Sequence, residues 1–446
     1  MKKILWVVIA ILMLAISGCY EEPLSDHNNS EEKPGNDEWG NPVEDLSLSP
    51  DGRFVVRGSG TSLNVIDLKT NETRSIKIDE SSRKLVFGRG TKIYISQDYS
   101  DDEIYDNCMI TELDLETGEH GRSWTGKGCV GISIDRTETV VAAWNKNNVF
   151  VVNTVTGLKY NYYFKKNIED VKWLPLTDEL AVVTRYGSDE LRVNFLSPLI
   201  GKLLKIPVGN CPDFLNVSPD GRFGAIASWG CETGVVSLID LKKHKYVRII
   251  RGSRMVEFTP NGKFMVNLAE KSELINNYGI EMLGSYNLVF TDTENFISEV
   301  VKLGNYAPQE LIIPNNEQIL IKMKHPDDGD LSGSVLDMKS EKITNVEDLN
   351  NYLREYVVAS DGKEIFAIKD SELYRLDLQD AQVEKIDLNC GPYYWSSEFC
   401  KSEELTISPD GDKIILGMVN GIDYAVFNVE YLKIEKMIRM ESQSGE

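Results

Sequence analysis

The sequence is poor in the residues that most often carry catalysis or bind metal ions. It has only four histidines, His27, His120, His244 and His325, and its seven cysteines include no C-x-x-C pair. Because a structural zinc site needs four Cys or His ligands at close spacings, we expect no metal site of this kind. The G-x-S-x-G motif, the P-loop and the dinucleotide-binding fingerprint are also missing. The sequence therefore predicts no cofactor and does not support the common hydrolases or nucleotide-dependent enzymes.

Positively charged residues are also few. The chain has 48 lysines and arginines against 70 aspartates and glutamates, which gives a formal net charge of −22 at pH 7. A field of this sign repels nucleic-acid phosphates and gains no attraction from anionic lipids. We therefore expect no nucleic-acid partner, and we attribute the acidic surface to solubility.

A long apolar run occurs only at the N-terminus. The basic start MKK precedes an apolar run over residues 4–16, and the small residues Ser17 and Gly18 then precede Cys19. This order is typical of a secretory signal, and the run is short for a membrane span. It resembles the signal of bacterial lipoproteins, which implies cleavage after residue 18, lipidation of Cys19 and a membrane anchor in the cell envelope. A plain secretory signal with an incidental cysteine is the alternative. Tyr20 resembles the residue found in lipoproteins sent to the outer membrane of Gram-negative hosts.

Residues 19–42 follow as an acidic segment. They contain many Glu, Asp, Asn, Pro and Gly residues and few apolar ones. Such a composition buries too little apolar surface to order itself, so we expect a flexible tether.

A repeated phrase dominates the rest of the chain. LSLSPDGRFVVRGSG begins at Leu46, LNVSPDGRFGAIASWG at Leu215 and LTISPDGDKIILGMV at Leu405, and weaker copies lie between them. Each unit reads as four short strands, called a to d in chain order, with alternating apolar residues bounded by turn residues. In the SPDG turn between strands a and b, Pro presets φ and Gly accepts a positive φ.

Nine such units occupy residues 43–439, at spacings of 38 to 54 residues. We therefore expect an all-β fold, a single β-propeller of four-stranded blades, followed by a polar tail over 440–446. Propellers typically have about four to eight blades, so the number is left at eight or nine. Strand c ends on Asp or Asn in every unit except the fourth: Asp67, Asp114, Asn153, Asp240, Asp292, Asp337, Asp377 and Asn428.

These units resemble the WD-like and YVTN-type repeats of bacterial extracytoplasmic propellers. The resemblance implies the fold and an extracytoplasmic location and does not specify a ligand. The segment ELDLETGEHGRSW resembles one repeat of the quinoprotein-type propellers. Because one unit alone carries it, we expect no quinone cofactor.

The strand order predicts two unlike faces of the ring. The a–b and c–d turns are uniformly short, so they make one face, which we call the plain face. Long insertions fall only in the b–c and d–a connections, which make the loop-rich face; they cover 97–108, 270–285, 324–333 and 389–404. Insertions gathered on one face of a repeat protein often mark its binding face.

Six cysteines follow Cys19, and all lie in or beside connections of the loop-rich face. Six cysteines allow fifteen pairings. Proximity in the sequence favours three disulfides, which an exported compartment permits: Cys108–Cys129, Cys211–Cys231 and Cys390–Cys400.

Aromatic residues gather on the same face. Exposed aromatic side chains are favoured interface anchors, although those at strand ends serve equally well to cap the core. The candidate binding residues are Trp144, Tyr186 and Trp229 at strand-b ends, and Tyr393, Tyr394 and Trp395 between Cys390 and Cys400. The acidic segments 98–106 and 327–330 supply carboxylates that suit calcium, but neither has a known calcium-loop spacing, and a solvated surface is the simpler interpretation.

Two functions remain open at this point. The first is a lipid-anchored, non-enzymatic binding or scaffold module that presents a disulfide-braced face to a protein or glycan. The second is a propeller enzyme or metal-binding carrier with a site in the central channel. A fold of this kind does not decide between them.

Overall fold

The computed structural model describes the ring with interruptions at its connections, and every regular element in the described part is a β-strand. No helix there is long and apolar enough to span a membrane. The described residues are 41–42, 46–59, 61–79, 82–98, 107–127, 129–185, 192–197, 202–207, 212–228, 235–251, 255–270, 286–304, 307–324, 331–346, 355–369, 371–388, 402–418 and 423–439.

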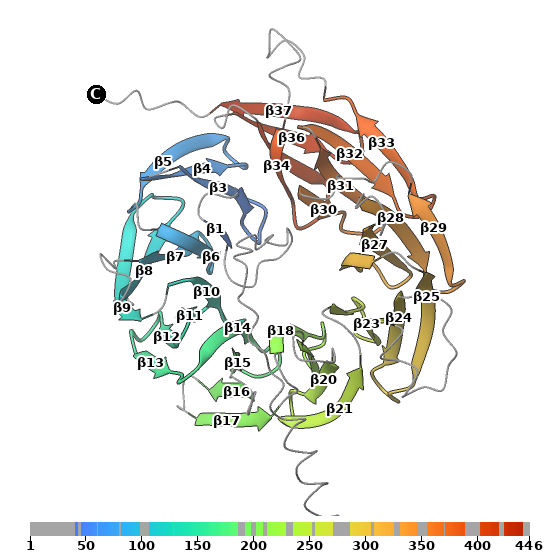
Figure 1. The fold of residues 1–446 in the computed structure, drawn as a ribbon. Coiled ribbons are helices and arrows are strands. Elements are labelled where there is room, and N and C mark those ends of the chain that lie inside the picture. The colour runs from blue at the N-terminus through green and yellow to red at the C-terminus, as the bar shows by residue number, and fades with distance from the viewer. Residues whose placement is uncertain are drawn as a thin grey trace, which may run out of the picture. The chain divides into compact units, whose positions relative to one another are not determined.

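The strands form nine antiparallel sheets of four consecutive strands, arranged as blades around a ring (Figure 1). The predicted all-β propeller is confirmed, and its blade number is nine. A short strand, β1 (Asn41–Pro42), adds to the first strand of blade 2, so these two residues, assigned to the tether from the sequence, belong to the ring.

The strands of the first three blades are β2 (Ser47–Leu48), β3 (Phe54–Ser59), β4 (Ser62–Asp67) and β5 (Glu72–Lys77); β6 (Ser82–Phe87), β7 (Lys92–Asp98), β8 (Asn107–Asp114) and β9 (His120–Lys127); and β10 (Gly131–Ile134), β11 (Val140–Trp144), β12 (Asn148–Asn153) and β13 (Lys159–Tyr163). Those of blades 4 to 6 are β14 (Asn167–Trp173), β15 (Leu180–Arg185), β16 (Arg192–Ser197) and β17 (Lys202–Pro207); β18 (Pro212–Val217), β19 (Phe223–Ser228), β20 (Val235–Asp240) and β21 (Lys245–Arg251); and β22 (Val256–Phe258), β23 (Phe264–Glu270), β24 (Tyr286–Asp292) and β25 (Ser298–Gly304). Those of blades 7 to 9 are β26 (Ala307–Ile312), β27 (Gln318–Lys324), β28 (Leu331–Asp337) and β29 (Lys342–Val346); β30 (Glu355–Val358), β31 (Glu364–Lys369), β32 (Glu372–Asp377) and β33 (Gln382–Ile386); and β34 (Ser402–Ile407), β35 (Lys413–Met418), β36 (Asp423–Asn428) and β37 (Lys433–Arg439).

The hydrophobic core lies between blades rather than within them. Nine buried clusters each combine residues from two neighbouring blades, one cluster for every interface of the ring. Between blades 1 and 2, for example, Phe54, Val56 and Leu63 pack against Leu85 and Ile93. Since burying one such side chain contributes roughly 1.5–3 kcal/mol, these interfaces supply most of the stability of each blade.

The ring closes between blade 9 and blade 1 without a shared strand among those described. Figure 1 shows the red strands of blade 9 beside the blue strands of blade 1. Val55 and Ile66 of blade 1 pack against Ile415 and Tyr424 of blade 9. An ion pair of 2.7 Å between the Arg57 guanidinium and the Glu404 carboxylate adds to this interface.

The plain face consists of two kinds of turn bonded to each other. In the first a–b turn, the Ser49 hydroxyl accepts the Phe54 N–H at 2.8 Å and donates to the Asp51 carboxylate at 2.6 Å. Turns at Ser218, Thr259 and Ser408 repeat this arrangement. A backbone hydrogen bond joins the c–d turn to the a–b turn in all eight blades whose c–d turn is described, as from Leu68 N–H to the Arg53 carbonyl. The two turn types therefore share one face, as the sequence predicts.

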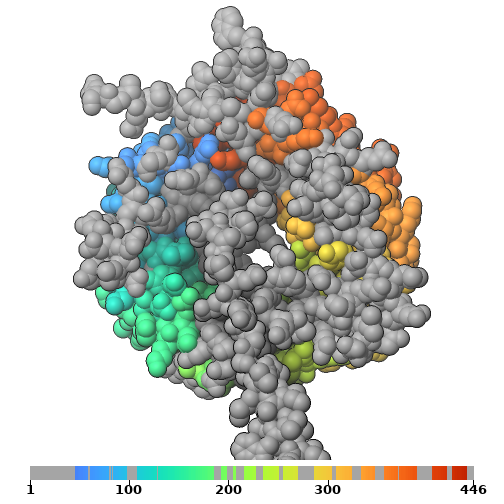
Figure 2. All heavy atoms as spheres, viewed as in Figure 1, coloured from blue at the N-terminus to red at the C-terminus, as the bar shows by residue number. Residues whose placement is uncertain are grey.

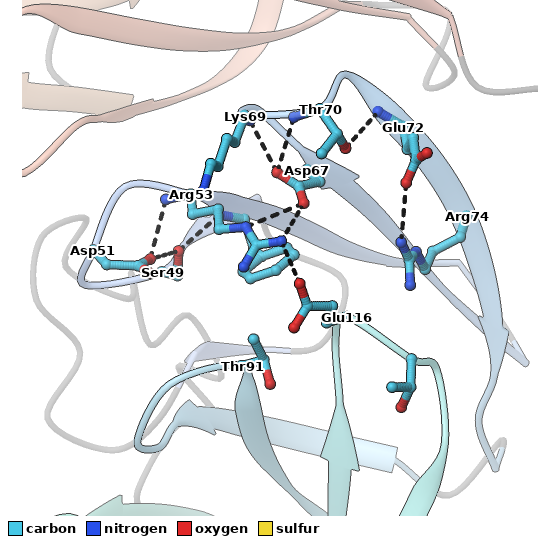
Figure 3. A network of polar contacts seen from close by, with 12 residues as sticks. Ser49, Asp51, Arg53, Asp67, Lys69, Thr70, Glu72, Arg74, Thr91 and Glu116 are labelled. Atoms are coloured by element: carbon cyan, nitrogen blue, oxygen red, sulfur yellow. Dashed lines mark hydrogen bonds and ion pairs between the residues drawn. The ribbon is translucent and has the colours of Figure 1, made fainter.

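All eight Asp or Asn residues predicted at the end of strand c cap the following turn. Their Oδ1 atoms accept backbone N–H groups two or three residues further on. Figure 3 shows the first case, in which Asp67 accepts the N–H groups of Lys69 and Thr70. Its second oxygen pairs with Arg53 at 2.7 Å, and Arg53 also reaches Glu116 of blade 2. These side chains tie the first two blades together.

We predict that Asp67 makes the protein sensitive to acid. Burial raises the pKa of Asp67, but the Arg53 side chain and the N–H groups of Lys69 and Thr70 outweigh burial, so its pKa is lowered. The resulting stabilisation is complete above the unfolded-state pKa of about 4 and is lost as the pH falls through the lower folded-state value. Denaturant unfolding at pH 7 and at pH 3 should show that the unfolding free energy falls less between these two pH values for Asp67→Asn than for the wild type. The exposed control Glu72→Gln should behave like the wild type. An equal decrease in unfolding free energy from pH 7 to pH 3 in all three proteins would contradict this role.

A second prediction concerns the close approach of neighbouring a–b turns. Gly411 has a φ of 78°, and a Cβ built on it would lie 2.3 Å from Ser360 Oγ in the preceding turn. Gly157 has a φ of 75° but no heavy atom within 4 Å of such a Cβ among the described residues. Gly157→Ala should therefore lose about 1 kcal/mol of unfolding free energy through backbone strain alone. Gly411→Ala should lose clearly more in the same measurement, and equal losses would show that the turns do not pack as described.

Candidate functional site

Three of the residues singled out from the sequence lie in the described part of the ring. These are Cys108, Cys129 and Trp144, and all three are at blade 3 or its border with blade 2. The others lie outside the described residues: Cys19, Tyr186, Cys211, Trp229, Cys231, Cys390, Tyr393, Tyr394, Trp395 and Cys400. Most of the four long insertions also falls outside them.

One of the three predicted disulfides is present between described residues. Cys108, in β8, is bonded to Cys129, which lies between β9 and β10, with 5.3 Å between the Cα atoms. Both side chains are buried against Tyr94, Trp124 and other residues at the interface of blades 2 and 3. The predicted pair is therefore confirmed, and it fixes the segment that leads into blade 3.

Trp144 is a core residue in this structure. Its side chain is 1% exposed and belongs to the cluster between blades 3 and 4. Its cross-strand partner is Gly131, where a Cβ would lie 2.4 Å from the indole ring. The missing side chain at Gly131 makes room for the ring. The structure therefore gives Trp144 the core-capping role that the sequence left as its alternative.

Two short connections of blade 3 lie side by side on the loop-rich face. Asn147, in the b–c connection, accepts the Phe164 N–H through its carbonyl at 2.8 Å, and the carbonyl of Lys146 accepts the Ile168 N–H at 2.6 Å. The Asn145 side chain also accepts the N–H of Asn147 and so holds the b–c connection in its bend. These bonds bring Lys146 next to the segment that contains Lys165 and Lys166.

The outer strands of blades 2 and 3 continue this basic surface. The Asn161 side chain of β13 accepts the backbone N–H of Lys127 at 3.2 Å, and Lys159 Nζ donates to the Thr125 carbonyl at 3.3 Å. A Cβ on Gly126 would overlap the Phe150 ring, so the glycine permits this close approach. The strands thereby hold Lys127 and Lys159 along one seam.

We call Lys127, Lys146, Lys159, Lys165 and Lys166 the basic rim of blade 3. Residues 120–168 contain seven lysines and arginines but two acidic residues, and none of 139–168 is acidic, although the whole chain is strongly acidic. Large apolar side chains are also exposed: Val130 at 59% beside the loop-rich connections, Tyr163 at 72% at the end of β13, and Leu158 at 57% just before its start. Exposed apolar groups within a charged border are typical of interaction sites. A count of charge along the sequence would have found this region, whereas the average over the chain concealed it.

A separate cluster of polar side chains lies toward the inner side of blades 6 to 8. In Figure 1 the first strands β14, β18 and β30 lie on the inner side of their blades, and Figure 2 shows an opening near the middle of the ring. Tyr356 of β30 donates to Glu310 of β26 at 3.2 Å, and Lys322 of β27 lies 3.9 Å from the same carboxylate. Burial, then the charges of Glu310 and Glu257, raise the pKa of Tyr356, so its hydroxyl remains protonated and acts as a donor. Among the described residues, no three His, Cys, Asp or Glu side chains are placed to hold a metal ion.

Comparisons with known proteins support the fold. Residues 122–280 match the family described as eukaryotic translation initiation factor eIF2A, which is less than half of the chain. The structure is similar to that of a dihydro-heme d1 dehydrogenase, NirN, with 13% identity and a TM-score of 0.51, over 92% of this chain and 75% of that one. It is also similar to dipeptidyl peptidase 4 from Porphyromonas gingivalis, with 10% identity and a TM-score of 0.50, over 88% of this chain and 66% of that one. No curated protein sequence matches the chain. At such low identities, the structural similarity extends to the β-propeller and not to an activity.

We predict that the Cys108–Cys129 bond stabilises the ring. The bond closes a loop with a sequence separation of 21 residues, which corresponds to about 3 kcal/mol in the chain-entropy description. The double substitution Cys108→Ala and Cys129→Ala should reduce the unfolding free energy by roughly that amount, measured by denaturant unfolding without reductant. A peptide map of the native protein should contain the linked pair. Free thiols at both positions, or unchanged stability of the double variant, would contradict the bond or its role.

Proposed function

We propose that this protein is a non-enzymatic binding or scaffold module of the bacterial cell envelope, with a protein or glycan partner on its loop-rich side. The contrast between the two sides of the ring carries this proposal. Hydrogen bonds join the turns of the plain face in all eight blades whose c–d turn is described. On the other side, blade 3 presents lysines and exposed apolar side chains next to a disulfide. A rigid scaffold that carries one chemically distinct surface suits binding.

The proposed location rests on the N-terminal sequence. A basic start, a short apolar run and small residues before Cys19 support export and lipidation of that cysteine. Two or more acyl chains give durable anchoring, because each buried CH₂ contributes about 0.8 kcal/mol. The acidic segment that follows suits a tether between the anchor and the ring.

A site in the channel is the second candidate, and one observation favours it. Tyr356, Glu310 and Glu257 place a donor and two carboxylates on the first strands of three neighbouring blades, and Lys322 adds a cation from the second strand of blade 7. Groups of this kind bind or orient small polar ligands in many proteins. The ion pair and hydrogen bond within the group also satisfy it without a ligand, so we place it second.

The proposal is tested by charge reversal at blade 3. Full-length protein with Lys146→Glu and Lys165→Glu should recover its envelope partners about tenfold less efficiently than the wild type, because the charge at the contact changes sign. Quantitative mass spectrometry of cross-linked complexes measures the recovery. Lys339→Glu and Lys342→Glu change two exposed lysines at the plain-face end of blade 7 and serve as the matched control.

Equal recovery by the wild type and both variants would overturn the choice of surface. Peptide mass analysis of the same material should find Cys19 at the N-terminus with acyl groups attached, and an unmodified Cys19 would contradict the anchor. Stoichiometric metal or a bound chromophore in the purified protein would favour the channel site instead.

A further inference from the structure

The outer strand of blade 3 differs from most other outer strands of the ring. The fourth strand of each blade is a sheet edge, and edges are commonly protected by charged side chains. Seven of the nine outer strands carry a charged residue beyond the first position. The two exceptions are β13, with the sequence KYNYY, and β29, with the sequence KITNV. β13 therefore presents an edge without the usual protection, and it carries three tyrosines.

The pairing of β13 identifies the backbone groups on its free edge. Asn153 N–H bonds to the Leu158 carbonyl at one end of the β12–β13 pair, and Phe164 N–H bonds to the Asn147 carbonyl at the other. Antiparallel partners alternate between bonded and non-bonded pairs, so every second residue of β13 faces β12. The backbone N–H and C=O groups of Lys159, Asn161 and Tyr163 consequently point away from the sheet. The side chains of all three are exposed.

The surroundings of this edge select the chemistry of a partner. Five lysines of the basic rim lie at the seam and connections of blade 3, and residues 139–168 contain no acidic side chain. A second copy of the chain pairing through its own β13 would bring the two sets of lysines together, which like-charge repulsion disfavours. A strand that carries carboxylates would gain both the backbone hydrogen bonds and the charge complementarity.

We propose that β13 accepts an extended acidic segment of a partner protein as a fifth strand of blade 3. Backbone groups at Lys159, Asn161 and Tyr163 bond to the added strand, and the lysines of the basic rim attract its carboxylates. Leu158 and Tyr163 provide exposed apolar surface for its uncharged side chains. This inference rests on the proposed binding function and names the partner chemistry at the same surface.

Proline substitution gives a specific test, because proline on the free edge removes an outward N–H without breaking the β12–β13 ladder. Asn161→Pro removes such a group, and Asn345→Pro is its counterpart in β29. Both asparagines are exposed, and each accepts one hydrogen bond through its side chain. The turns before the two strands match, with a positive φ at Gly157 in one and at Glu341 in the other. Asn161→Ala controls for loss of the side-chain hydrogen bond alone.

The probe is a fluorescent peptide of alternating glutamate and valine, and fluorescence anisotropy measures its binding to the full chain. The wild type should bind it in a salt-dependent manner and should not bind a matched lysine–valine peptide. Asn161→Pro should weaken binding about tenfold or more, whereas Asn161→Ala and Asn345→Pro should change it less than about threefold. Circular dichroism confirms that each variant is folded.

The outcomes separate this inference from the broader function. No binding of the acidic peptide by the wild type, or equal binding by wild type and Asn161→Pro, would overturn strand addition. Binding of an acidic glycan such as polygalacturonate, unaffected by Asn161→Pro, would show that the basic rim acts by charge alone. If the peptide test fails but charge reversal at Lys146 and Lys165 still abolishes partner recovery, the binding function stands and strand addition does not.

Discussion

Every sheet in this ring depends on its two neighbours, because both of its faces are apolar and neither is buried within the blade itself. The nine clusters between blades show this directly, and each draws residues from two sheets. A blade on its own would expose both faces to water at a cost of about 25 cal/mol per Å² of apolar surface. The ring is therefore stable as a closed whole, which makes its closure the critical step.

Closure is achieved by side chains. Blade 1 and blade 9 come from opposite ends of the chain, and neither contributes a described strand to the other. Val55 and Ile66 pack against Ile415 and Tyr424, while Arg57 pairs with Glu404 beside them. The ordinary inter-blade packing is thus repeated at the last interface, with an ion pair added to it. The turns of the plain face also come close together at this interface, because a Cβ built on Gly52 would lie 3.2 Å from the Pro409 ring.

The regularity that stabilises the ring also limits where binding surfaces arise. The a–b and c–d turns are held by the same hydrogen bonds in one blade after another, so their residues have little freedom to change and form a binding site. Blade 3 differs from the other blades on its loop-rich face and along its outer strand, β13. A disulfide holds the segment at Cys129, two connections are bonded together, and lysines replace the acidic residues that prevail elsewhere. These properties favour a preformed contact surface over one that becomes ordered on binding.

Local sequence information was sufficient for the fold, the turn chemistry and one disulfide. Strand alternation, the SPDG turns and the Asp or Asn at the end of strand c depend on contacts a few residues apart, so a single sequence displays them. It was not sufficient for the number of blades, the burial of Trp144 over Gly131 or the position of the basic rim at a sheet edge, although a count of charge along the sequence locates the lysine-rich region. The blade number depends on whether the last sheet fits against the first. The burial of Trp144 depends on the residue opposite it. The position of the basic rim depends on the hydrogen bonds that join the outer strands of blades 2 and 3 and the two connections of blade 3. By itself the sequence determined a propeller with a plain face and a loop-rich face. Only the tertiary structure decided that blade 3 concentrates positive charge at an exposed edge, because that proximity arises from packing between strands and blades.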